Sequence, residues 1–156
     1  MVRLIIVIML LTQLAACSSG YDPKTEPTTV TYSMVADEKV NPNVSGEATP
    51  IEIQVFELED DSMFLAADYD QLVDDAEKAL KSNYVDHSDY ALLPGQFKYI
   101  GTTEVDDDTR YIGVMARYAD PENSQWKKVV RVKSLGREYH ILMLFQENEV
   151  NLNIVE

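Results

Sequence analysis

The chain has 156 residues, with 13 Lys and Arg against 27 Asp and Glu, which gives a formal net charge of −14. Such a surface repels nucleic acid and anionic lipid head groups, which argues against a nucleic-acid-binding protein and against one that lies flat on a membrane. A single cysteine is present. No intramolecular disulfide can therefore form, and the fold must be stabilised by its apolar core.

The first 16 residues have the organisation of a secretory signal. Arg3 supplies a positive start, residues 4–11 are an unbroken apolar run, and Ala15 and Ala16 are the small residues that a processing site needs. The apolar run is too short to cross a bilayer, which takes about 20 residues. We therefore predict a signal peptide over 1–16 rather than a buried helix of the fold.

The cysteine follows these alanines directly, in the order Leu14-Ala15-Ala16-Cys17. This quartet resembles the bacterial lipobox, which implies that Cys17 is acylated and begins the mature chain. Several acyl chains on one residue would hold it firmly, because each buried methylene contributes about 0.8 kcal/mol. Ser18 comes next, which by resemblance to Gram-negative lipoproteins favours the inner leaflet of the outer membrane. The alternative is a free thiol after an ordinary signal.

Residues 17–27 are small, polar and broken by proline, which predicts a lipidated flexible tether. The remainder, 28–156, is long enough for one domain with its own core. Segments rich in β-branched and aromatic residues predict strands at 28–36, 51–58, 90–100, 110–119, 126–134, 139–146 and 148–156. Pro94-Gly95 divides one of them into two extended pieces. In 51–58 the apolar positions change side after Val55, which predicts a bulge or burial on both faces.

One segment, 67–82, has helical rather than strand periodicity. Its apolar residues form one stripe: Tyr69, Leu72, Val73, Ala76, Ala79 and Leu80. Asp68 and Gln71 have the spacing of a capping box, and the residues just before them are expected to add a helical turn. Short strands with one inserted helix predict an all-β fold, a two-sheet β-sandwich with a short helical insertion.

The connection 37–50 is long for a compact domain and has no periodicity. Connections near this length tend to be functional or disordered. Two prolines restrict its backbone, and Gly46 allows a tight turn. A stiffened loop can present Val40, Val44 and the asparagines to a partner at a lower ordering cost. A mobile connection without a role fits the composition equally well.

Residues typical of catalysis or metal binding do not occur at recognised spacings. His87, which we expect in a polar loop, and His140, in a strand, have no partner at metal-ligand spacing, and no nucleophile motif is present. The acidic runs 57–61 and 104–108 offer oxygens to calcium but lack the EF-hand spacing and glycine. We therefore predict no enzyme activity, no cofactor, no metal site and no small-molecule substrate.

The only local positive region consists of Lys127, Lys128, Arg131, Lys133 and Arg137. These residues either face an acidic partner or balance neighbouring acids on a sheet face. The second interpretation is favoured, because carboxylates are so numerous in this chain.

Four further blocks follow the lipobox in order: 40–58, 63–72, 92–96 and 111–130. They contain an asparagine-proline loop leading into a strand, a phenylalanine and alanine-aspartate pattern, a proline-glycine turn, and a late strand followed by a tryptophan. Together they cover nearly all of the mature chain. In this order they resemble the TssJ (VasD/SciN-like) family of outer-membrane lipoproteins of the type VI secretion system.

The resemblance implies a transthyretin-like sandwich and a non-enzymatic role. It implies an outer-membrane lipoprotein, facing the periplasm, that binds the periplasmic domain of the inner-membrane protein TssM and so anchors the membrane complex that also contains TssL. By position, the loop implied to hold TssM is 37–50. Its candidate partner-binding residues are Val40, Asn41, Pro42, Asn43, Val44 and Gly46.

Two alternative functions stay open. A periplasm-facing lipoprotein that binds a carbohydrate or a peptide would expose aromatic side chains on one face, for which Tyr99, Tyr111 and Trp126 are the candidates. A hydrolase or protease inhibitor on a sandwich scaffold would need a convergent acid-base set, which the sequence does not indicate.

Overall fold

The computed structural model describes residues 23–155, so the predicted signal peptide, Cys17 and the first part of the tether lie outside the described residues. In chain order its strands are β1 (Thr29–Ala36), β2 (Ile51–Leu58), β3 (Tyr84–Leu92), β4 (Phe97–Glu104), β5 (Tyr111–Arg117), β6 (Lys127–Arg131), β7 (Glu138–Phe145) and β8 (Val150–Val155). Helices α2 (Ser62–Ala66) and α3 (Tyr69–Leu80) lie between β2 and β3, and 3-10 turns cover Lys81–Asn83 and Pro121–Asn123.

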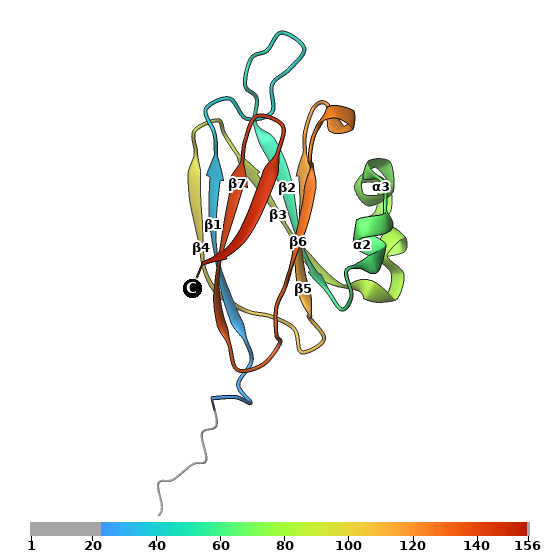
Figure 1. The fold of residues 1–156 in the computed structure, drawn as a ribbon, viewed down its shortest axis with the longest axis vertical. Helices are drawn as coiled ribbons and strands as arrows, with labels where there is room; N and C mark the ends of the chain where they lie inside the picture. Colours follow the sequence, from blue (N-terminus) through green and yellow to red (C-terminus); the bar gives the residue numbers. More distant parts are fainter. Residues whose placement is uncertain (1–22, 156) are drawn as a thin grey trace, which may run out of the picture.

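The strands form two sheets, in the orders β4-β1-β7-β8 and β3-β2-β5-β6. The sheets face each other, and α2 and α3 cover the outer side of the second sheet (Figure 1). β1 pairs in parallel with β7, whereas the other strand pairs are antiparallel. The predicted all-β sandwich with an inserted helix is therefore confirmed.

Strand β2 is buried on both faces, which explains its change of apolar side. Ile53 and Val55 belong to the core between the sheets, whereas Phe56 and Leu58 belong to a second apolar cluster beneath the helices. The pairing of β2 with β5 runs without a shift, and its pairing with β3 shifts only at the last residue. The apolar residues of β2 therefore change side because the strand is buried on both faces, and not because it contains a mid-strand bulge.

Close packing of the helices on this sheet depends on a glycine in β5. A Cβ atom on Gly113 would lie 3.1 Å from Cζ of Phe64 and 3.2 Å from Cδ1 of Leu58. Such contacts are tighter than packed side chains normally make. The absence of a side chain at Gly113 therefore lets the Phe64 ring approach the sheet.

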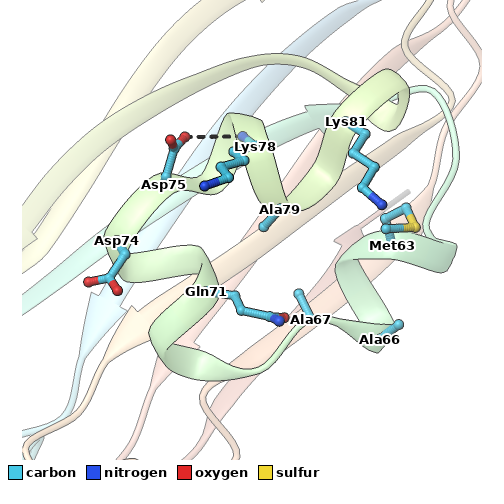
Figure 2. A pocket seen from close by; sticks show the side chains of 9 residues that line it. All are labelled: Met63, Ala66, Ala67, Gln71, Asp74, Asp75, Lys78, Ala79 and Lys81. Atoms are coloured by element: carbon cyan, nitrogen blue, oxygen red, sulfur yellow. Dashed lines mark hydrogen bonds between the residues drawn. The ribbon is translucent and has the colours of Figure 1, made fainter.

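Helix α3 begins as predicted and then bends. The Asp68 carboxylate accepts the Gln71 N–H at 2.9 Å, and the Gln71 amide oxygen accepts the Asp68 N–H at 3.1 Å, which forms the expected capping box. Within the helix, Asp75 leaves helical geometry at φ −161° and ψ 84°. Its carboxylate accepts the Lys78 N–H at 3.1 Å and caps the second helical piece (Figure 2).

The placement of His87 in a polar loop is wrong. β3 already begins at Tyr84, so His87 lies within a strand, with its Nδ1 2.7 Å from the Tyr84 hydroxyl. β3 is the edge strand of its sheet, and its first two-thirds is largely exposed. Because an exposed edge strand can be polar on both sides, this one lacks the alternation that marks a strand in the sequence.

The last part of the predicted tether packs against the domain. Pro27 forms a β-bridge with Leu135, and the Gly136 N–H donates to the Glu26 carbonyl at 2.8 Å. Gly136 has φ +69°, and a Cβ there would lie 2.8 Å from the Cα of Lys24. The prediction of a flexible tether through residue 27 is therefore too long, because the turn after β6 holds its end.

The domain carries its own core. Within residues 23–155, the members of the two apolar clusters lie between Val30 and Ile154. No helix within residues 23–155 is both long and apolar enough to span a membrane.

Lys127 clamps the end of α2 onto the sheet. Its Nζ donates to the carbonyls of Phe64 and Leu65, both at 2.8 Å, and of Ala67 at 2.7 Å. Carbonyls in the last turn of a helix have no donor within the helix, so a cation there satisfies them. Burial lowers the pKa of Lys127, and the negative charge of Asp68 opposes this shift. Lys127 is therefore a structural cation rather than part of a free basic face.

Replacing Lys127 by methionine is expected to lower the free energy of unfolding by about 1–3 kcal/mol, because three carbonyls lose a charged donor. Urea unfolding of the native and variant domains measures this loss. Lys128→Met is the matched control, since within residues 23–155 Lys128 Nζ donates only to the Gln125 side chain, at 2.9 Å, and a change within about 0.5 kcal/mol is expected there. Equal losses in the two variants would rule out the clamp.

Candidate functional site

The loop 37–50 projects from the end of the sandwich opposite to the point where the described chain starts (Figure 1). Its two arms are joined by a β-bridge between Pro42 and Ala48. The Asn43 N–H also donates to the Glu47 carbonyl at 2.9 Å. The loop is thus an ordered, hairpin-like projection with a buried base and an exposed tip.

Asn41 holds the base of this loop. It is 6% exposed and has a left-handed backbone with φ +51°, a conformation that asparagine tolerates better than most residues. Its Oδ1 accepts the Ala119 N–H at 2.6 Å, and its Nδ2 donates to the Pro50 carbonyl at 2.8 Å and to Thr49 Oγ1 at 2.9 Å. The Asn41 N–H donates to the Glu147 carbonyl at 3.0 Å. One residue therefore ties together three connections of the sandwich.

The expectation that Val40 is presented to a partner is wrong. Its side chain is 0% exposed and belongs to the core between the sheets. Nearby, the Tyr118 hydroxyl donates to the Gln146 carbonyl at 3.1 Å. Burial, and to a smaller extent the charge of Glu149, raises the pKa of Tyr118, so this hydroxyl stays protonated at neutral pH. Val40 and Asn41 support the loop rather than form its surface.

The tip is an ordered turn that exposes an apolar side chain. The Asn43 side-chain oxygen accepts the N–H groups of Ser45 at 2.9 Å and Glu47 at 3.1 Å, and the Gly46 N–H donates to the Asn43 carbonyl at 2.8 Å. Gly46 has φ +80°, which confirms the predicted tight turn. Val44 at the apex has 108% relative exposure. Of the six candidate residues, Val44 and Gly46 are therefore exposed, Pro42 and Asn43 are half-buried, and Val40 and Asn41 are buried.

Other exposed apolar side chains share this end of the molecule. Leu93, in the turn between β3 and β4, and Phe97, at the start of β4, are each 60% exposed. The Gly95 N–H of the same turn donates to the Asp37 carbonyl at 3.1 Å, which links this turn to the loop. Solvent-exposed apolar groups that gather at one end are typical of a protein-docking surface.

The aromatic face expected for a carbohydrate- or peptide-binding protein is not assembled. Tyr99 is exposed, but Tyr111 and Trp126 are partly buried and pack against the cluster beneath the helices. The rings of Tyr69 and Trp126 meet edge to face, with centroids 5.2 Å apart. The three candidates therefore do not form one exposed platform.

A hollow of about 450 Å³ lies between α2 and α3 (Figure 2). Its lining includes Met63, Gln71, Asp74, Lys78 and Lys81, with no histidine, serine or cysteine. A nucleophile and a matching base are thus not brought together here.

The acidic runs serve to shape a turn. Glu57 Oε2 accepts the Thr109 hydroxyl at 2.6 Å and the Asp106 N–H at 2.9 Å. Asp106 in turn accepts the Asp108 N–H at 2.9 Å. Among the residues from 23 to 155, no three His, Cys, Asp or Glu side chains lie close enough to hold a metal ion.

This arrangement defines a β-sandwich protein with an ordered loop projecting from one end. Residues 28–153 match the family described as type VI secretion lipoprotein (VasD, EvfM, TssJ), and the chain belongs to this family. No curated protein matches the sequence significantly.

Solved structures share the fold. The type VI lipoprotein TssJ1 from Pseudomonas aeruginosa is 28% identical, with a TM-score of 0.79 over 84% of this chain and 98% of that chain. Lip from Serratia marcescens, a membrane-bound component of the same kind of system, is 27% identical, with a TM-score of 0.70 over 84% and 98%. A chain in a structure described as the TssM C-terminal domain from EAEC is 22% identical, with a TM-score of 0.67 over 82% and 98%, and shows the fold alone.

Asn41→Ala is expected to lower the free energy of unfolding by about 2–4 kcal/mol, because the Ala119 N–H and the Pro50 carbonyl lose their partner and the left-handed backbone becomes strained. Urea unfolding measures the change, and Ser45→Ala at the exposed tip is the control, expected within about 0.5 kcal/mol of the native domain. An unchanged Asn41→Ala midpoint would show that the base does not depend on this side chain.

Proposed function

We propose that this type VI secretion lipoprotein is acylated at Cys17, resides in the outer membrane facing the periplasm, and anchors the secretion complex by binding the periplasmic domain of TssM. The observation that carries the proposal is the ordered loop tip, which holds a fully exposed Val44 on a buried polar base. TssL joins the same assembly through TssM, and no small-molecule substrate is involved.

The direction of the chain supports this role. The described residues start at one end of the sandwich, and the loop 37–50 projects from the other (Figure 1). A lipid at Cys17 would therefore leave the loop facing away from the membrane. The docking end and the anchor end are thus separated by the length of β1.

The structure of the loop supports tight docking. Burial of apolar surface contributes about 25 cal/mol per Å², and Val44, Leu93 and Phe97 are the exposed apolar groups available at this end. A loop that is already ordered loses little conformational entropy on binding. The acidic surface acts mainly on the rate of encounter rather than on final affinity.

A charge at the tip tests the interface. Calorimetry of soluble residues 18–156 with the periplasmic domain of TssM is expected to show binding. Val44→Asp is expected to weaken it at least about tenfold, which is about 1.4 kcal/mol, because a carboxylate would be desolvated at the contact. Val155→Asp is the matched control, because Val155 is also exposed but lies at the end of β8 away from the loop, where it pairs with His140 of β7.

The outcomes separate the role from the site. Binding that both variants leave unchanged would keep TssM as the partner and move the contact away from Val44. No binding by the folded native domain to its cognate TssM would overturn the proposed function and favour the ligand-binding alternative, which a screen of carbohydrates and peptides would then examine.

A further inference from the structure

A basic hollow lies at the end of the sandwich opposite to the loop. It has a volume of about 580 Å³ and is lined by Arg110, Arg131, Val132, Lys133, Ser134, Leu135 and Tyr139. We propose that this hollow binds a phosphate group of the lipid head groups in the membrane to which the chain is anchored. The proposal rests on the acylation of Cys17 proposed above and adds a second, polar contact with the same membrane.

The charge of the hollow is unusual for this chain. Its lining contains Arg110, Arg131 and Lys133 but no carboxylate. Within residues 23–155, no carboxylate oxygen lies within 4.0 Å of the charged nitrogens of these three side chains, since the ion pairs found are His87–Asp89 and Arg117–Glu52. Arg131 and Lys133 therefore form no close ion pair with the acids that lie nearby. These cations remain available to an external anion.

Part of the hollow is already ordered. Arg110 Nη1 donates to the carbonyls of Asp107 at 2.6 Å and Thr109 at 3.0 Å, and to Ser134 Oγ at 3.0 Å. A guanidinium held in this way offers its remaining N–H groups to a phosphate with little loss of freedom. The Tyr139 hydroxyl accepts the Lys133 N–H at 3.2 Å, so its own proton is free to donate to the same anion.

The position of the hollow links it to the anchor. The bridge between Pro27 and Leu135 brings the start of the domain beside the lining. Six residue steps separate Cys17 from Pro23, a distance of at most about 21 Å. An acylated Cys17 would therefore keep the hollow within reach of head groups. Such tethering produces an effective concentration in the millimolar range, so a site of millimolar affinity would be about half filled.

Acids around the hollow restrict the contact. Glu26, Glu104 and Glu138 line the neighbouring hollow together with Arg137, and a turn at 106–108 carries three aspartates. These carboxylates repel an anionic membrane surface. Contact is therefore confined to the basic hollow, which would orient the domain on its tether rather than lay it flat.

The reactivity of Lys133 provides the test. Residues 17–156 are coupled through Cys17, the only thiol, to a maleimide lipid in vesicles of phosphatidylcholine, with or without phosphatidylglycerol. Acylation of each lysine by a succinimidyl ester is followed by mass spectrometry, with exposed Lys39 at the loop end as reference. Relative to the same protein in phosphate-free buffer without vesicles, vesicles are expected to slow the reaction of Lys133 about twofold or more, because a millimolar effective concentration half-fills a millimolar site. Phosphatidylglycerol then shows whether a net negative head group adds to the effect of the phosphate that both lipids carry.

A matched pair of variants tests the assignment. Arg131→Gln is expected to abolish the protection of Lys133, whereas Lys78→Gln, which removes one exposed charge on α3, is expected to preserve it. A parallel sample with inorganic phosphate and no vesicles separates the sources: protection there shows that free phosphate also enters, and protection on vesicles alone assigns the site to head groups. Equal Lys133 reactivity in all samples, or protection that survives Arg131→Gln, would overturn the proposal.

The coupling chemistry keeps this test separate from the proposed function. Maleimide attachment at Cys17 does not depend on natural acylation, and TssM is absent from the vesicles. A failure of Lys133 protection would therefore leave the TssM proposal standing. A failure of TssM binding would likewise leave the result of the vesicle experiment unchanged.

Discussion

The burial of one sheet on both faces is the constraint on which the rest of the fold depends. Phe56, Leu58 and Met115 point away from the sandwich core and must be covered. The segment between β2 and β3 supplies that cover as α2 and α3, and Gly113 and Lys127 let the helices approach closely and hold them there. The other sheet needs no such cover, so the molecule has one helical side and one open side (Figure 1).

A rigid body of this kind allows stability and recognition to be divided within a single loop. Val40 is buried in the core and Asn41 is buried and hydrogen-bonded to the domain, whereas the Val44 side chain is fully exposed to solvent. The tip can therefore change in sequence without loss of fold, as long as its turn geometry is kept. The base of the loop cannot change in this way, because the hydrogen bonds of Asn41 hold the connections after β5 and β7 in place.

The sequence predicts what depends on neighbours along the chain. Alternation locates β1 and β8, the capping residues Asp68 and Gln71 locate the start of α3, and loop length draws attention to 37–50. The features that the sequence does not predict depend on contacts between residues far apart along the chain. The burial of Asn41 follows from Ala119, 78 residues away, and the role of Lys127 follows from carbonyls about 60 residues earlier. No local pattern encodes these contacts, so the loop and its exposed Val44 were predictable from the sequence, but the burial of Val40 and Asn41 was not.

The central position of β1 would have a mechanical consequence under the proposed role, in which the lipid holds one end of the domain and TssM holds the other. β1 starts next to the segment that leads from the tether and ends directly before the loop, so tension between the two attachments runs along this strand. It lies between β4 and β7 and is hydrogen-bonded to both. Because both attachments lie at the ends of the same strand, a pull between them is carried by the covalent backbone of β1, and the hydrogen bonds to β4 and β7 keep the strand in register. The strand order thus suits the domain to sustained force.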